Sequence, residues 1–206
     1  MNDFLPVSCK KKKLQFSYTI LLSISASHLT RGISDVFAQG AGLVNPMNAL
    51  VPGLVYDRDE DDYTKFLNGQ GYTEAQKKEL NCSSDVMEKI EASELNYPTI
   101  TIVVPKDKTQ YMKSINRRVT CLGNTSCHYR AKVEIHENIE GNKIVVKPNI
   151  LHFDEKIREK QFTVHFKVNK KNRTTTITTA SLQWTSEKDK SGKNHIVESL
   201  IVIYYL

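Results

Sequence analysis

The feature that most constrains the fold is an alternation of apolar and polar residues that recurs from Leu95 onward. It is clearest from Tyr129 to Ile135 and from Phe162 to Val168, where every second residue is apolar. Because successive side chains of a strand point to opposite faces, this period of two predicts strands with one buried face. Turn-forming pairs separate the strands at Gly141-Asn142, Pro148-Asn149 and Ser191-Gly192. About seven such strands in about 110 residues predict a mainly β protein with a β-sandwich.

Residues 35–94 have a different pattern and predict loops and short helices. Asp59 to Asp62 place negative charge at the start of one helix, which is expected to end at Asn68-Gly69. Thr73 and Gln76 have the spacing of a capping box for a further helix, from about Glu74 to Leu80. The sandwich is therefore expected to follow a segment of short helices and loops.

Composition indicates a globular protein and argues against a nucleic-acid partner. The 206 residues are 39% hydrophobic and 25% charged, with a formal net charge of +6. Lys10 to Lys13 supply part of that charge from one short run, and Lys167, Lys170, Lys171 and Arg173 are expected to be a solvated strand end and turn. A nucleic-acid surface needs a clustered basic face, ideally with stacking aromatics.

No catalytic, metal or cofactor site is predicted. Cys9, Cys82, Cys121 and Cys127 contain no Cys-x-x-Cys pair, and the six histidines are scattered without the helical spacing of a metalloprotease. The carboxylates from Asp57 to Asp62 are expected to form a solvated helix cap rather than an acid and base pair. No glycine-rich loop that could hold a phosphate is present.

Residues 1–34 have a weak targeting signal. Lys10 to Lys13 followed by Leu14 to Ser27 imitate the charged and apolar regions of a signal peptide, but polar residues interrupt the apolar run. The run is too short and polar to cross a bilayer, so no stable membrane span is expected. The alternatives are a weak signal peptide and an unrelated start created by truncation or by wrongly joined upstream sequence.

Three sequons mark candidate N-glycosylation sites at Asn81, Asn124 and Asn172. They would accept glycans only if the chain enters the secretory pathway.

A set of motifs carries a resemblance to a known family. Gly40 to Asp57 resembles the segment that ends the catalytic domain of plant subtilisin-like serine proteases, or subtilases. Further family-like motifs follow in the family's order, at Asp62-Tyr63, Gly71-Tyr72, Leu95 to Ile100, Arg117 to Gly123, Lys147 to Phe153 and Ala180 to Trp184. The resemblance extends from about residue 36 to about residue 202.

The resemblance implies three parts: an unmatched segment at 1–34, the C-terminal remnant of a peptidase domain at 35–94, and a fibronectin type III-like domain at 95–206. Leu182 and Trp184 are expected in the core of the last, since a lone tryptophan on an alternating strand is usually structural. Six residues of the 35–94 segment are expected to expose apolar surface unless they fold back on the sandwich: Phe37, Val44, Leu54, Val55, Tyr56 and Phe66.

The catalytic motifs of the family have no counterpart. Subtilases cleave peptides with an Asp, a His and a Ser in a Gly-Thr-Ser-Met motif, and the most similar triplet here is Asn124-Thr125-Ser126. Ser126 lacks that context and is expected in a glycosylatable turn, where neither a base nor oxyanion donors are supplied.

The cysteines carry two expectations. The family often has a cysteine at the position of Asn68, which would pair with the position of Cys82, so Cys82 is expected to be a free thiol or to be masked beside Asn81. Cys121 and Cys127 flank a turn and are candidates for a hairpin disulfide in an oxidising compartment, because opposed residues on neighbouring strands approach the required separation. The alternative is two unpaired thiols.

Two functions of different classes remain open. One is a non-catalytic C-terminal fragment of a subtilase that acts as a structural or interaction module, with a subtilase peptidase domain as its partner in cis or in trans. The other is that this sequence is an incomplete part of an active, secreted serine endopeptidase. The resemblance implies the secretory pathway for both.

Overall fold

The computed structural model covers the whole chain, and its described residues are 52–82, 85–122, 127–136, 141–170, 176–187 and 194–206. The predicted N-terminal segment at 1–34 and the sequon residues Asn124 and Asn172 lie outside them.

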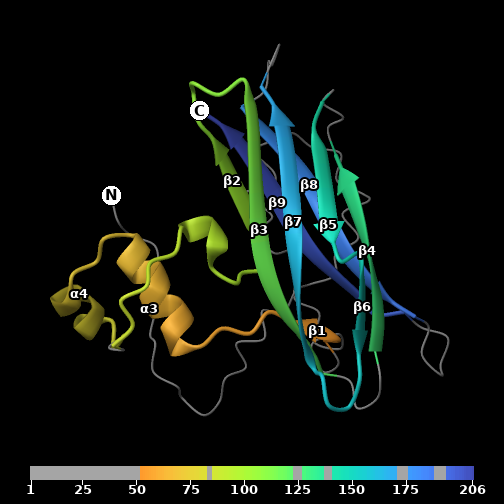
Figure 1. Cartoon of the computed structure of the whole chain (residues 1–206), viewed down its shortest axis with the longest axis horizontal. Coiled ribbons are helices and arrows are strands. Elements are labelled where there is room, and N and C mark those ends of the chain that lie inside the picture. Colours follow the sequence, from red (N-terminus) through yellow and green to blue (C-terminus); the bar gives the residue numbers. More distant parts are fainter. Residues whose placement is uncertain (1–51, 83–84, 123–126, 137–140, 171–175, 188–193) are drawn as a thin grey trace.

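Two antiparallel-rich sheets form a sandwich (Figure 1). The first has the strand order β1-β3-β7-β5 and the second β2-β9-β8-β4-β6. All strand pairs are antiparallel except β2 and β9, which run parallel. The strands are β1 (Leu54–Val55), β2 (Ile100–Val104), β3 (Gln110–Cys121), β4 (Cys127–Ile135), β5 (Lys143–Lys147), β6 (Ile150–Phe153), β7 (Glu159–Asn169), β8 (Ile177–Ser186) and β9 (Ile196–Tyr205).

The core lies between the two sheets and confirms the alternation that predicted it. In β7, Phe162, Val164 and Phe166 are buried, while the residues between them are partly exposed. Trp184 and Leu182 are fully buried on β8, as expected, and the Trp184 ring meets the Phe162 ring edge-on at 5.1 Å between centroids. The sequence prediction of a mainly β sandwich is confirmed.

The helices begin where their capping residues predicted. Helix α3 (Glu60–Gly69) has Asp59 as its N-cap, and α4 (Glu74–Glu79) has Thr73, each within a capping box. A short 3-10 helix, η2 (Ala92–Glu94), follows. We call residues 56–97 the helical segment; α3 and α4 lie beside the sandwich in Figure 1.

The residues directly before the helical segment belong to the sandwich. Leu54 and Val55 pair with Cys121 and Thr120 of β3, and with Tyr56 they are buried. Gly53 has φ +75°, and a Cβ there would lie 2.6 Å from the Tyr129 hydroxyl, so a glycine is required where the chain enters the sheet. These apolar residues therefore fold back on the sandwich. The boundary at 94/95 stays a prediction.

Candidate functional site

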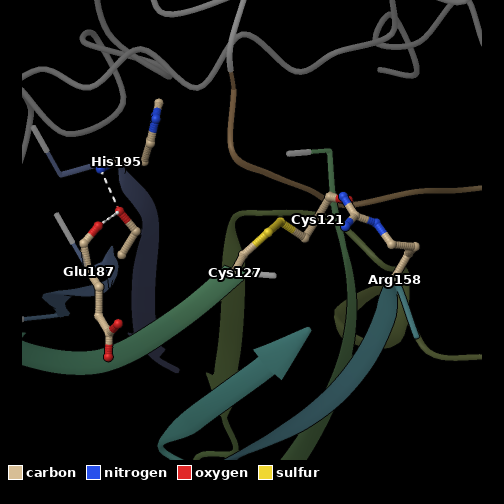
Figure 2. The surroundings of a disulfide bond; sticks show 6 residues. Cys121, Cys127, Arg158, Glu187 and His195 are labelled. Carbon is tan, nitrogen blue, oxygen red and sulfur yellow. Dashed lines mark hydrogen bonds between the residues drawn. A yellow bond between two sulfur atoms is a disulfide. The ribbon is translucent and has the colours of Figure 1, made fainter. Parts of the chain in front are cut away.

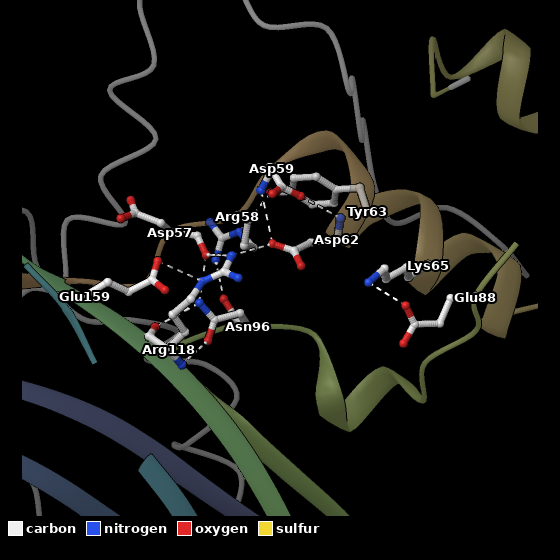
Figure 3. A network of polar contacts seen from close by, with 10 residues as sticks. All are labelled: Asp57, Arg58, Asp59, Asp62, Tyr63, Lys65, Glu88, Asn96, Arg118 and Glu159. Carbon is white, nitrogen blue, oxygen red and sulfur yellow. Dashed lines mark hydrogen bonds and ion pairs between the residues drawn. The ribbon is translucent and has the colours of Figure 1, made fainter. Parts of the chain in front are cut away.

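A network of polar contacts joins the helical segment to β3 (Figure 3). We call it the joint, and its principal residues are Asp57, Arg58, Asp62, Asn96, Arg117 and Arg118. Asn96 lies at its centre and is 9% exposed. Its side-chain amide donates to the Asp57 carbonyl at 2.7 Å and to the Arg118 carbonyl at 2.9 Å, and its oxygen accepts from the Arg118 N–H at 2.9 Å. The side-chain amide of Asn96 thus joins the backbone at Asp57 to the backbone of β3 at Arg118, where it both donates and accepts a hydrogen bond.

Arg118 connects this amide to α3. The Nη2 atom of its guanidinium donates to the Asp62 carboxylate at 3.0 Å, and its Nε lies 3.4 Å from the Glu159 carboxylate without hydrogen-bond geometry. Asp62 also accepts from the Asp59 N–H in the capping box, so one carboxylate both starts the helix and holds it to β3. The Asp57 to Asp62 run is thus more than the solvated cap expected from the sequence.

Arg117 is a buried cation, 2% exposed, that bonds only backbone carbonyls. Its Nε donates to the Tyr97 carbonyl at 2.8 Å, and its Nη2 donates to the Ser93 carbonyl at 3.0 Å. Burial lowers the pKa of Arg117 to about 10, so the guanidinium stays protonated at neutral pH. The planar guanidinium of Arg117 has several N–H donors, so it can bind the carbonyls of Ser93 and Tyr97 at the same time. These bonds hold the turn that follows η2 in place.

Arg58 packs between aromatic rings at the outer side of the joint. Its guanidinium lies 4.7 Å from the Tyr97 ring centroid, and its Nε donates to the Tyr63 hydroxyl at 3.0 Å. In a third contact, the Nη1 atom of Arg58 donates to the Asn96 carbonyl at 3.2 Å. Cation–π and hydrogen-bond contacts therefore link α3 to the residues that precede β2.

Tyr56 anchors the start of the helical segment inside the sandwich. Its hydroxyl lies 2.7 Å from the Ser199 Oγ on β9, and both side chains are buried. Burial raises the pKa of Tyr56 to about 12, so the phenol is neutral and able to donate.

Within the helical segment, Asn68 occupies the position where subtilases often have a cysteine. It is buried; its amide donates to the Val86 carbonyl at 2.7 Å, and its oxygen accepts from Lys77 Nζ at 2.6 Å. Buried Lys77 also pairs with Glu74. The polar side chain thus takes a structural role by hydrogen bonding.

Cys82 corrects a sequence prediction. It is fully buried and disulfide-bonded, so the expectation of a free thiol is wrong. That expectation rested on pairing with the position of Asn68, and the loss of a cysteine there does not remove the bridge from Cys82.

Cys121 and Cys127 form a disulfide (Figure 2). Cys121 ends β3 in one sheet, whereas Cys127 begins β4 in the other, so the bridge connects the two sheets. The expected hairpin is wrong because β3 and β4 are not hydrogen-bonded neighbours. Arg158 stands beside the bridge and donates to the Cys121 carbonyl at 2.6 Å.

The first candidate glycosylation residue, Asn81, is exposed at the turn after α4. Its φ of 56° lies in the left-handed region, which asparagine tolerates better than most residues.

From the sequence, the residues of the joint were noted only as a helix cap and as parts of motifs, and no contact among them was predicted. Their signal was the acidic run at 57–62 together with Arg117-Arg118, which only the fold brings together.

One serine and histidine pair requires a chemical test. Ser114 Oγ and His165 Nδ1 lie 2.8 Å apart on neighbouring strands β3 and β7. A serine hydrolase uses Nε2 as the base and holds Nδ1 with a carboxylate, whereas here the serine occupies Nδ1. In the described residues no carboxylate hydrogen-bonds His165, and the pair lines an open depression together with Met112 and Phe166. Its geometry is that of a cross-strand hydrogen bond.

The described residues contain neither a membrane-spanning helix nor a cluster of metal ligands. No helix there is long and apolar enough to cross a membrane. No cluster of three or more metal-ligating side chains occurs within those same ranges.

Comparison with known proteins identifies the family. The Fibronectin type-III domain family matches residues 94–203. Among curated relatives, Subtilisin-like protease SBT4.14 of Arabidopsis thaliana is 35% identical over 87% of this chain and 24% of its own length. Subtilisin-like protease SBT1.2 of the same plant is 36% identical over 68% of this chain and 18% of its own length. The chain thus spans about a quarter or less of these relatives.

Solved structures add little to this. The periplasmic chaperone SfaE aligns with 52% of this chain and 55% of its own at 10% identity, and its TM-score of 0.34 supports no functional comparison. The subtilisin-like relatives and the observed sandwich both agree with the family resemblance that the motifs between Gly40 and Trp184 indicated. The chain therefore belongs to the fibronectin type-III domain family, in the form found in the C-terminal region of plant subtilisin-like proteases.

Proposed function

We propose that the chain is a non-catalytic structural and interaction module that binds a subtilisin-like peptidase domain. The observation that carries this is the joint, which holds the helical segment to the sandwich through buried Arg117 and Asn96. A segment with such a small apolar core of its own is held in one orientation by these contacts. It can therefore present a defined surface to a partner.

The exposed apolar side chains of the helical segment favour a docking role. Tyr72 is 42% exposed and Met87 is 83% exposed, although the segment also contains buried apolar residues. In the family, the segment resembled by residues 35–94 closes the peptidase domain. The proposed partner is accordingly that domain, in cis within a longer protein or in trans.

The absence of catalysis by these residues is part of the proposal. Acyl transfer requires a nucleophile, a base and preformed oxyanion donors held together, and the Ser114–His165 pair has no carboxylate that orients it among the described residues. A serine-directed fluorophosphonate should leave the purified chain unlabelled. Labelling that disappears in Ser114→Ala would contradict this part of the proposal.

The second candidate is an active secreted endopeptidase whose catalytic residues are encoded upstream of this sequence. The similarity to subtilisin-like proteases over only part of their length supports this candidate as much as it supports the separate module. Sequencing the transcript upstream of the codon for Val36 distinguishes the two. An in-frame Gly-Thr-Ser-Met segment would assign the activity to the longer protein, and its absence would favour the separate module.

The secretory pathway is the proposed location. Among the described residues, Cys82, Cys121 and Cys127 are disulfide-bonded, with a cross-sheet bridge at Cys121 and Cys127, and such bonds persist in oxidising compartments. The protein should be found in plant apoplastic fluid. Cys121 and Cys127 of that material should resist alkylation until a reductant is added.

Binding provides the direct test of the module. The full chain is mixed with the peptidase domain of a relative such as SBT4.14, produced without its own C-terminal region, and complex formation is measured by size-exclusion chromatography. Tyr72→Ser with Met87→Ser should weaken the complex, whereas Met112→Ser, which changes an equally exposed methionine on β3, should not. No complex, or equal loss in the control, would refute docking through the helical segment.

A further inference from the structure

A pair of histidines lies on the outer surface of the β2-β9-β8-β4-β6 sheet, away from the joint. His128 of β4 and His152 of β6 are directly opposed in the strand register. Their neighbours Tyr129, Leu151 and Phe153 are buried in the core, so the two imidazoles stand on the opposite, solvent-facing side. The strand ladder therefore positions the pair on a rigid element.

The imidazoles face each other through the same ring atom. The two Nδ1 atoms lie 2.6 Å apart, and the ring centroids are 4.6 Å apart with an interplanar angle of 81°. At that separation the two nitrogens share one proton, because two unprotonated lone pairs repel and two N–H groups clash. The structure thus holds two nitrogen ligands next to each other on adjacent strands.

We propose that His128 and His152 form a two-histidine binding site for a divalent transition-metal ion, because their Nδ1 atoms lie next to each other across adjacent strands. Metal–imidazole distances are about 2.0–2.1 Å, so two nitrogens bound at a right angle are about 2.9 Å apart. The two nitrogens need to separate by about 0.3 Å from the observed spacing, and each ring must turn so that its lone pair points at the ion rather than at the other nitrogen. The proton between the two nitrogens moves to Nε2 of its own ring, and the ion takes its place between two neutral imidazoles.

Glu187 is an acidic neighbour of the pair, but no third protein ligand completes the site among the described residues. The backbone N–H of Glu187 donates to the His128 carbonyl at 3.2 Å, so an acidic residue lies opposite His128 on the other side of β4. The described residues contain no cluster of three ligands, so water completes the coordination. Imidazole nitrogen favours the later first-row metals, and the expected order of affinity is Cu²⁺ above Ni²⁺ and Zn²⁺.

Metal binding at this pair has a structural consequence. β6 is a short edge strand of residues 150–153, paired only with β4 in the described sheet. An ion held by one histidine from each strand cross-links the edge to the sheet interior. It therefore stabilises the folded state by mass action, because the unfolded chain does not hold the two imidazoles together.

The chain offers a matched control at His165. This histidine also stands on an exposed strand face, and its Nδ1 lies 2.8 Å from a cross-strand side chain, but that neighbour is the Ser114 hydroxyl. It therefore has the same placement with only one imidazole. A site that depends on the pair should respond to His128 and His152 and not to His165.

The test uses the full, oxidised chain without a polyhistidine tag. Cu²⁺ is titrated and followed by calorimetry and by electron paramagnetic resonance, where two equivalent nitrogens should split the copper signal of one bound ion. His128→Gln and His152→Gln should each weaken binding by about tenfold or more, since even partners outside the ligand shell change metal affinity by that much. His165→Gln should bind as the wild type does.

A diamagnetic ion gives an independent readout. Zn²⁺ should shift the imidazole NMR signals of His128 and His152 and leave that of His165 in place. Circular dichroism checks that the exposed substitutions leave the fold intact. The proposal is refuted if the single variants bind Cu²⁺ as tightly as the wild type, or if His165→Gln weakens binding equally.

Discussion

The sandwich and the helical segment are held together by different forces. In the sandwich, Ile115, Trp184 and Ile201 are fully buried between two sheets, so apolar burial dominates. In the helical segment the buried apolar cluster contains only Leu67 and Cys82, with partly buried neighbours. Its position depends instead on polar side chains at the joint. A segment with little core of its own is thus oriented by directional contacts to a stable neighbour.

The largest expected effect tests the apolar side of this comparison. Trp184→Ala should lower the free energy of unfolding by about 3–5 kcal/mol, because it removes a fully buried ring and leaves a cavity beside Phe162. Urea denaturation measures the loss. Met112→Ala, at a side chain 76% exposed, should change stability by less than about 0.5 kcal/mol. If Trp184→Ala and Met112→Ala lowered the free energy of unfolding equally, apolar burial in the core would not be the main source of the sandwich's stability.

The next effect tests the buried cation of the joint. Arg117→Met keeps the aliphatic length but leaves the carbonyls of Ser93 and Tyr97 without this donor, at a cost of about 1–3 kcal/mol. Hydrogen exchange should accelerate in residues 93–97 before it does in β8. Arg117→Lys keeps the charge and should lose less. Unchanged exchange in Arg117→Met would mean that these contacts do not hold the turn.

A smaller effect is expected at the half-buried ion pair of the joint. A double-mutant cycle with Arg118→Ala and Asp62→Ala should give a coupling of about 0.5–1 kcal/mol. The more exposed Lys132–Glu134 pair on β4 is the control, and its coupling should be near zero. If the control pair couples as strongly, the joint has no special role in holding α3.

The smallest effect depends on pH. Hydrogen bonding and ion pairing with Lys113 of β3 hold the pKa of Glu91 below its ordinary value. A lowered folded-state pKa gives stability that is present above the unfolded pKa of glutamate and is lost as pH falls through the folded one. Glu91→Gln should therefore flatten the stability profile slightly in that acidic range and leave the slope near neutral pH unchanged. Denaturation midpoints across the range measure it; an unchanged acid slope would exclude the contact.

Local patterns predicted the elements well. The period-two runs predicted strands of the sandwich, and the acidic run from Asp59 and the capping box at Thr73 predicted the starts of α3 and α4. Leu182 and Trp184 were correctly expected in the core. These features depend on neighbours in the chain, so the sequence carries them directly.

Features that join distant residues were missed or mistaken. The hairpin expected for Cys121 and Cys127 is a link between sheets, because a short connection can also cross from one sheet to the other. Arg118 and Asp62 are far apart in the sequence, and no local pattern pairs them. The opposition of His128 and His152 follows from strand register, which periodicity alone leaves open.

The sequence by itself determined the sandwich class, the starts of α3 and α4, the alternation that forms the apolar core and, through its motifs, the relation to subtilisin-like proteases. These follow from local periodicity, capping chemistry and residue identity. Only the tertiary structure decided that Leu54 and Val55 extend a sheet and that buried Arg117 and Asn96 orient the helical segment. The physical reason is that hydrogen bonds and ion pairs act over a few ångströms, so their partners are chosen by sheet order and register rather than by position along the chain.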